Sequence, residues 1–341
     1  TTEIYTLSLH DALPIYVSCF HDLNALPEVE TSRIITTGGH YAFLKIAEGC
    51  DKHCTYCIIP SLRGNYRSVP MERLLKEANE LADQGVRELI LVAQETTLYG
   101  VDLYGKKMLP ELLHKLAEIP GIYWIRIQYC YPEEITDELI EAIRTEEKVC
   151  HYLDVPIQHA SDRILKRMGR RTNQAQLREI IGKLRAAVPD IALRTTMISG
   201  FPGETQEDHE EVMRFVDEME FERLGVFTYS AEEDTPAAAF PDQIPEEVKE
   251  ERRDEIMELQ QEIAFEKSES MVGRVLDVMI EGKVADEAAY VGRTYMDAPN
   301  VDGYIFVNSG ELFMSGDFVR VKVTGSNDYD LIGEVYDESA E

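Results

Sequence analysis

The chain of 341 residues, 44% of them apolar, is long enough to form about two packed domains. It carries 64 acidic and 34 basic side chains, a formal net charge of −30, which disfavours a nucleic-acid substrate because phosphate backbones would be repelled. Its six cysteines do not have the pattern of a secreted disulfide framework, and no apolar run approaches the roughly 20 residues that span a bilayer, so we expect a soluble, cytoplasmic protein.

The N-terminal segment lacks the pattern of a folded domain. Residues 1–16 resemble translated adapter sequence, and residues 17–40 contain Pro27 and the pair Gly38-Gly39 without a clear period. Cys19 lies in this segment without a nearby cysteine, and we interpret it as incidental. We therefore expect residues 1–36 to be a non-native leader and linker.

Between residues 37 and 240, short apolar runs alternate with segments of helical period, which is typical of strand–helix units around a parallel sheet. The expected strands are 41–47, 88–93, 122–128, 150–155, 191–198 and 224–229. The expected helices are 71–84, 110–119, 136–145, 174–187 and 206–219. Six such units predict an α/β domain built as a partial (β/α) barrel, in which functional groups gather at the carboxyl ends of the strands.

The loop after the first expected strand contains Cys50, Cys54 and Cys57, with the spacing Cys-x3-Cys-x2-Cys. Three thiolates on one loop can converge on one metal centre, and such soft ligands favour zinc or an iron–sulfur cluster. A 4Fe-4S cluster held by three cysteines keeps one iron free for a small molecule. The spacing favours the cluster over two alternatives, a structural zinc site with His53 as fourth ligand and unliganded thiols.

Polar residues also follow the five further strands of this domain, including Gln128 with Tyr129 at the end of the third strand and Ser230 after the last. The candidates among them are Gln94 and Glu95, then Gln158 and His159, and then the turn 199–204 with Gly200 and Glu204. Because the carboxyl ends of parallel strands lie at one edge of the sheet, these residues are candidates for binding a ligand. The alternative for each group is structural, namely helix capping, a buried histidine and a tight Pro/Gly turn.

The C-terminal third has a different pattern. Residues 241–270 are charged with apolar residues at helical spacing, which predicts a connecting helix with a narrow buried stripe. In residues 271–341 apolar and polar residues alternate with a period of two, which is typical of β-strands. This pattern predicts a small all-β, OB-like barrel of five short strands, at 274–281, 288–295, 303–307, 318–324 and 331–336. This segment holds 14 acidic and five basic residues, including Asp297, Asp302 and Asp317, so its surface should attract a basic protein.

Four stretches carry a resemblance to a known family. The segment YAFLKIAEGCDKHCTYCIIPSLRG, residues 41–64, resembles the cluster motif of the radical S-adenosylmethionine (SAM) methylthiotransferases, and the five-strand unit resembles their TRAM domain. The segments VAQETTLYG, residues 92–100, and MDAPNVDG, residues 296–303, resemble the branch that acts on an aspartate of small-subunit ribosomal protein 12. That branch usually has aspartate at position 95, so Glu95 is a departure.

The resemblance implies a transferase that adds a methylthio group to the β-carbon of that aspartate. It implies a 4Fe-4S cluster held by Cys50, Cys54 and Cys57, with SAM bound at the open iron. It also implies SAM contacts from Tyr56, Gln94, Glu95, Gln158, His159, Gly200 and Glu204, without assigning a catalytic residue. The expected partners are small-subunit ribosomal protein 12 or the small ribosomal subunit, and an electron donor such as a flavodoxin or ferredoxin, but neither free tRNA nor a membrane.

Family members also carry an N-terminal domain whose three cysteines hold a second 4Fe-4S cluster. Cys19, Cys130 and Cys150 do not reproduce that set, so we expect a truncated chain with the second cluster only in the missing domain.

Two alternatives to this function remain. A tRNA adenosine methylthiotransferase of the same family would need a basic barrel surface, and a non-catalytic metal-binding module would not need polar residues at five strand ends.

Overall fold

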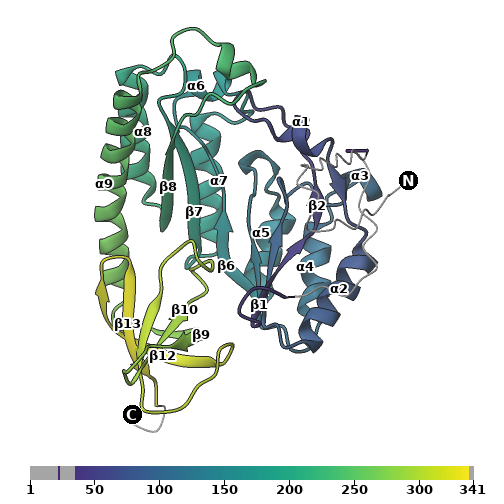
Figure 1. The fold of residues 1–341 in the computed structure, drawn as a ribbon, viewed down its shortest axis with the longest axis vertical. Helices are drawn as coiled ribbons and strands as arrows, with labels where there is room; N and C mark the ends of the chain where they lie inside the picture. Colours follow the sequence, from purple (N-terminus) through teal and green to yellow (C-terminus); the bar gives the residue numbers. More distant parts are fainter. Residues whose placement is uncertain (1–21, 24–34, 338–341) are drawn as a thin grey trace, which may run out of the picture.

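The computed structural model describes residues 22–23 and 35–337. Most of the expected leader, including Cys19, lies outside the described residues. An α/β domain, a long helix and a small β-barrel follow one another along the chain. The barrel lies at one end of the α/β domain, and the long helix α9 runs along its side (Figure 1).

Six parallel strands form one open sheet in the described part of the chain, in the order β1-β4-β5-β6-β7-β8. They are β1 (Tyr41–Lys45), β4 (Glu88–Val92), β5 (Trp124–Ile127), β6 (Val149–Asp154), β7 (Ala192–Ser199) and β8 (Arg223–Thr228). Within these described residues β1 and β8 do not pair with each other, so the sheet stays open and the predicted partial barrel is confirmed.

Helices cover the outer face of the sheet (Figure 1). The five longest in this domain are α2 (Met71–Asp83), α4 (Leu109–Ala117), α5 (Asp137–Thr145), α7 (Gln174–Ala187) and α8 (Gln206–Met219). Leu89 and Leu91 of β4 share a buried core with Leu74 of α2 and Leu112 of α4, as the apolar spacing predicts. Three of these helices begin after residues whose side chains accept a hydrogen bond from the backbone N–H three positions later, namely Thr136, Asn173 and Thr205.

Several short elements have no counterpart among the sequence predictions. They are β2 (Ala47–Glu48), β3 (Arg67–Ser68), α1 (Ile59–Arg63), α3 (Val101–Tyr104), α6 (Asp162–Arg167) and the 3₁₀ turns Pro132–Glu134 and Pro236–Ala239. Each is too short for a hydrophobic period to be recognised in the sequence.

Helix α9 (Glu246–Ser270) has a buried face that is largely polar. Ile256 and Ile263 are buried as expected, but the same face also buries Lys249, Arg252, Gln260 and Ser268. The predicted apolar residues therefore lie on the buried face, which also carries polar side chains that the sequence pattern did not indicate. The reason is that these long polar side chains reach backbone carbonyl and carboxylate groups at the ends of the strands, which offset the cost of their burial.

The C-terminal strands close into a barrel in the order β10-β11-β13-β12-β9, which confirms the predicted five-strand unit. They are β9 (Val275–Lys283), β10 (Ala289–Arg293), β11 (Ile305–Asn308), β12 (Phe318–Asn327) and β13 (Asp330–Val335). Its interior is filled by apolar side chains from several strands, including Val278, Ile280, Ile305 and Val321, all fully buried. Closure leaves this sheet without a free edge.

A buried network of charges joins the barrel to the sheet. Arg126 Nε and Arg293 Nη2 donate to the two oxygens of Glu88 at 2.7 and 2.6 Å, and all three side chains are fully buried. Arg293 also donates to Glu281, which contacts His40 at 2.7 Å. Burial would raise the pKa of Glu88, but the two guanidinium groups lower it overall, so the carboxylate stays charged.

Other contacts place the barrel at the amino ends of the strands. Trp124, the first residue of β5, packs edge-on against Phe318 of the barrel with ring centroids 4.8 Å apart. Tyr41, the first residue of β1, accepts a hydrogen bond from Asn300 at 3.0 Å. The carboxyl ends of the strands therefore lie on the side of the domain away from the barrel.

Two of the acidic residues expected on the barrel surface belong to this junction. Asp297 and Asp302 are buried, and they pair with Arg223 at 2.5 Å and with Arg194 at 3.5 Å. The expectation of surface charge at these two positions was therefore wrong, because their partners lie in strands distant in the sequence. Asp317 is exposed, as expected.

Within residues 22–23 and 35–337, every helix is too short or too polar to cross a lipid bilayer.

The junction network generates a stability prediction. We expect Glu88→Gln to destabilise the protein by about 3–5 kcal/mol, because the change leaves the buried guanidinium of Arg126 without a carboxylate and that of Arg293 with Glu281 alone. Denaturant unfolding followed by the fluorescence of Trp124, the chain's single tryptophan, would report the loss, since this residue lies at the junction. The matched control is Glu141→Gln, which removes a fully exposed ion pair with Arg144. Equal unfolding midpoints for the two variants would contradict the prediction.

Candidate functional site

The cysteine loop leaves the carboxyl end of the first strand and is fixed there through its backbone. Gly49 adopts φ 81°, and a Cβ at this position would overlap the backbone oxygens of Asn65 and Gly64, the latter at 2.6 Å. Gly49 N donates to Gln94 Oε1 at 2.8 Å, and Cys50 N donates to Gly64 O at 3.2 Å. The start of the loop is thus set by a close backbone approach that only glycine permits.

The remainder of the loop is held by the neighbouring strand ends. Lys52 is buried and pairs with Glu134 and, at 3.4 Å, with Glu133. Thr55 donates from its backbone to Met168 at 2.9 Å and from its hydroxyl to Arg167 at 2.8 Å. These contacts tie the loop to the segments that follow β5 and β6.

A cavity of about 310 Å³ lies beside the loop. Its lining residues are Cys50, Cys57, Ile59, Ala93, Gln94, Tyr129 and Tyr131. Cys54 lies just behind this wall, with Sγ 3.5 Å from the Tyr131 hydroxyl. In the described part of the chain all three thiols of the loop are free of disulfides, and no three His, Cys, Asp or Glu side chains already converge in metal-binding geometry.

The protonation of the loop thiols depends on whether a cation is bound. Burial raises the pKa of Cys50 to about 11 and also raises the pKa of Cys57, so both are neutral thiols when no cation is present. A positively charged iron–sulfur centre would favour the thiolate forms. His53, which the zinc alternative would need as its fourth ligand, is exposed.

Gln94 and Glu95 have different surroundings. Gln94 lines the cavity and also holds Gly49. Glu95 is fully buried, and one of its carboxylate oxygens accepts hydrogen bonds from the backbone and hydroxyl of Thr97. Its other oxygen has no partner among the described residues, and burial raises the pKa of Glu95 to about 7. Glu95 therefore lies behind the loop and does not line the cavity.

Tyr56 is turned toward an aromatic cluster. Its ring contacts Phe201 edge-on at 6.5 Å, and Phe201 in turn contacts Tyr229 and Phe240. Burial raises the pKa of Tyr56, so its hydroxyl stays neutral. Tyr56 thus packs the cysteine loop against the turn that follows β7.

The residues at the ends of β6 and β7 form a second, buried group. His159 Nδ1 accepts from Ser161 N at 2.9 Å, so His159 Nε2 carries the proton and faces Glu204 Oε2 at 3.3 Å. Gly200 N and Phe201 N donate to the same oxygen at 2.9 and 3.2 Å. The amides of this turn are thus occupied by Glu204. Burial would raise the pKa of Glu204, but its hydrogen-bonded and charged neighbours lower it overall.

Gln158 lies apart from that group and is partly exposed. It has φ 73°, and its backbone pairs with β7, donating to Thr196 O at 2.9 Å. Of the seven non-cysteine candidates, only Gln94 lines the cavity with two of the cysteines.

Sequence reasoning missed several residues around the loop. Tyr131 and Tyr129 line the cavity, and the buried guanidinium of Arg170 lies 4.3 Å from the Tyr131 ring centroid. Tyr129 adjoins the polar residue Gln128 at the end of β5, and this position at a strand end is the feature of the sequence that could have identified it. Arg170 follows a six-residue helix and has no recognisable signal in the sequence.

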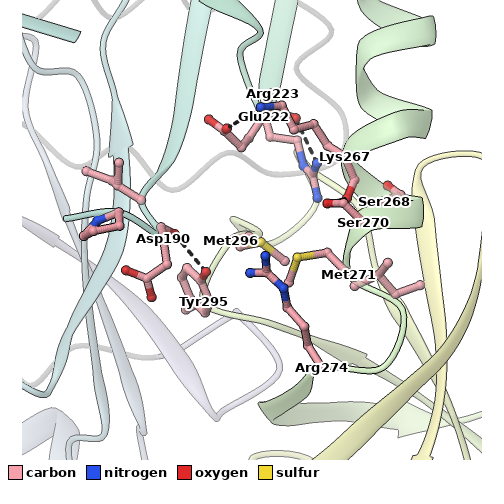
Figure 2. A pocket seen from close by; sticks show the side chains of 13 residues that line it. Asp190, Glu222, Arg223, Lys267, Ser268, Ser270, Met271, Arg274, Tyr295 and Met296 are labelled. Atoms are coloured by element: carbon pink, nitrogen blue, oxygen red, sulfur yellow. Dashed lines mark hydrogen bonds and ion pairs between the residues drawn. The ribbon is translucent and has the colours of Figure 1, made fainter. Parts of the chain in front are cut away.

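Two further cavities lie at the junction with the barrel, away from the cysteine loop. One has a volume of about 430 Å³ and is lined by residues of β7, β8, α9 and the barrel. The other, of about 180 Å³, is shown in Figure 2, and its lining includes Arg223, Lys267 and Arg274. There Tyr295 donates to Asp190 O at 2.8 Å, and Lys267 pairs with Glu222 at 3.5 Å. Neither cavity contains a thiol, so the cysteine cavity remains the candidate site.

Comparison with known proteins gives two matches to family models. The model of the radical SAM superfamily matches residues 44–216, and the model of the TRAM domain matches residues 272–335.

The sequence is also similar to named relatives. It is 68% identical over 314 residues to the ribosomal protein uS12 methylthiotransferase RimO of Lachnoclostridium phytofermentans, which covers 92% of this chain and 71% of that protein. It is 52% identical over 322 residues to the protein of the same name from Acetivibrio thermocellus, which covers 94% of this chain and 71% of that protein. Among solved structures, the radical SAM enzyme coproporphyrinogen III oxidase (HemN) of Escherichia coli has a TM-score of 0.50 at 16% identity, covering 83% of this chain and 67% of that one. The last likeness concerns the fold alone.

The close approach at Gly49 generates a prediction about metal content. We expect Gly49→Ala to lose most of its iron after anaerobic reconstitution, because the new Cβ would displace the start of the cysteine loop. Gly85→Ala is the matched control, since Gly85 has φ 98° but no atom within 4 Å of an added Cβ. Its cost should be limited to about 1–2 kcal/mol of backbone strain. Iron and sulfide assays on both variants test this, and full iron content in Gly49→Ala would refute it.

Proposed function

The chain belongs to the RimO family of radical SAM methylthiotransferases, and from this membership we propose that it adds a methylthio group to the β-carbon of an aspartate in ribosomal protein uS12. The observation that carries the proposal is the loop of three free cysteines at the carboxyl edge of a partial parallel barrel. Parallel barrels of this kind place their chemistry at that edge.

The cysteines would hold a 4Fe-4S cluster, and the surrounding residues would shape its cavity. When bound, the cluster and SAM supply an organic radical that removes a hydrogen atom from an unactivated carbon. Gln94 fixes the loop through Gly49, and Tyr129, Tyr131 and Ile59 form much of the cavity wall. Such walls limit the access of water to a reactive intermediate.

We assign SAM to the space around this cavity. Gln94 supports the assignment most directly because it lines the cavity together with Cys50 and Cys57. The other proposed contacts surround it at the ends of neighbouring elements, namely Tyr56, Glu95, Gln158, His159, Gly200 and Glu204. His159 and Glu204 are buried, so they would act by holding the backbone of the turn after β7.

The proposed boundaries of the folded units are residues 37–240 for the radical SAM domain, 241–270 for the connecting helix and 271–341 for the TRAM domain. They enclose the segments that the family models match.

The charge of the barrel supports a protein partner. Residues 271–341 contain 14 acidic and five basic residues, and Glu287, Glu311 and Glu334 are exposed. An acidic surface attracts basic proteins and repels phosphate backbones. A ribosomal protein, or its surroundings on the small subunit, fits this charge better than free tRNA.

A first prediction concerns stoichiometry. We expect the anaerobically reconstituted chain to hold about four irons, the content of one 4Fe-4S cluster, since a single loop carries three clustered cysteines. The triple variant Cys50→Ala, Cys54→Ala, Cys57→Ala should hold none. Cys130→Ala and Cys150→Ala serve as controls, because these two buried cysteines lie outside the cavity. Bound zinc, or iron retained by the triple variant, would count against the cluster.

A second prediction concerns the partner. Replacing Glu287, Glu311 and Glu334 by Lys should slow association with uS12 by about tenfold or more at low salt, because exposed charges set the encounter rate. The difference should shrink as salt is added, since screening acts over about 8 Å at physiological ionic strength. Stopped-flow association measures the rate, and formation of 5′-deoxyadenosine should be unchanged in the variant. Salt-sensitive binding of free tRNA, without affinity for uS12, would instead favour a tRNA substrate.

A further inference from the structure

The first turns of α9 contact the carboxyl ends of β7 and β8 directly. Lys249 Nζ donates to Tyr229 O at 2.9 Å, and Ser199 Oγ donates to Lys249 O at 3.0 Å. Gly200 has φ 69°, and a Cβ added there would lie 2.9 Å from Lys249 Cβ and still closer to its Cγ. The helix therefore packs against the backbone of the turn that follows β7.

Arg252, one turn further along α9, reaches into the same turn. Arg252 Nη1 donates to Glu204 Oε1 at 2.8 Å and to Glu204 O at 3.3 Å, and both side chains are nine-tenths or more buried. The other oxygen of Glu204 accepts from the amides of Gly200 and Phe201. The guanidinium thus holds the carboxylate that in turn holds both amides.

The connection extends beyond the α/β domain. Helix α9 ends at Ser270, and β9 of the barrel begins at Val275. Along the helix, Gln260 Nε2 donates to Phe221 O at 2.8 Å, and Lys267 pairs with Glu220 at 3.2 Å. One continuous helix therefore joins the barrel to the turn beside the proposed SAM site.

We propose that Arg252 is a positioning residue, which through Glu204 sets the backbone of residues 200–204 for SAM binding. The inference rests on the proposed function, since it assumes that SAM lies against this turn. A buried ion pair is weak support for stability, because apolar residues of similar size often serve as well. The four hydrogen bonds to the carboxylate of Glu204 from three separate segments instead specify one geometry of the turn.

Arg252→Met and Arg252→Lys test the proposal, with Arg253→Met as the matched control. Arg253 is the next residue of the same helix, more exposed, and pairs with Asp254. Removing a charge-assisted hydrogen bond should raise the KM for SAM by about tenfold in Arg252→Met and leave kcat within about twofold. Arg252→Lys should recover part of the loss, and Arg253→Met should match the wild type.

A second readout needs neither cluster nor SAM. Hydrogen exchange at the amides of Gly200 and Phe201, measured in the full chain without cofactors, should be faster in Arg252→Met and unchanged in Arg253→Met. If Arg252→Met does not fold, Glu204→Gln takes its place, since it keeps an acceptor oxygen but loses the ion pair. Faster exchange with an unaltered KM for SAM would overturn the positioning role, as would unaltered exchange with an altered KM. Failure of the loaded wild-type chain to cleave SAM would overturn the proposed function itself.

Discussion

The buried carboxylate of Glu88, shared by the guanidinium groups of Arg126 and Arg293, is the interaction on which the arrangement of the two domains depends. Its two partners come from different domains, one from β5 and one from β10. A buried charge that loses a partner is costly, so any shift of the barrel along the sheet would have to break the pair. Since Glu88 begins β4, this constraint fixes the barrel at the amino ends of the strands.

The opposite ends of the same strands are thereby free to carry the cysteine loop. The start of this loop is held by the hydrogen bond between Gly49 and Gln94, and its middle is held by the contacts of Lys52 and Thr55 with neighbouring segments. Two polar networks thus lie at the two ends of one apolar sheet, and α9 connects them along the side. The burial of Arg252 and Gln260 on that helix is a consequence of this path.

The sequence alone was sufficient to predict the helices whose hydrophobic pattern has a clear period. Helix Gln174–Ala187 and helix Gln206–Met219 have the predicted bounds, because a capping side chain marks each start and an apolar stripe marks each length. The spacing of the cysteines predicted one shared site, and in the structure Cys50 and Cys57 line one cavity with Cys54 beside it. The polar face of α9 and the burial of Asp297 could not be predicted, since their partners are distant in the sequence and meet only in the fold. For the same reason nothing in the sequence around Tyr131 indicates that this residue lines the cavity.

The open sheet has a consequence for the size of the target that can reach the site. A closed eight-unit barrel admits only what can enter through its mouth, whereas β1 and β8 remain unpaired in the described residues and leave one side of this barrel open. Phe227 of β8 is 63% exposed beside that opening. A loop that stays attached to a folded polypeptide can approach a site of this shape. A site of this shape therefore does not require its target to be an unfolded segment.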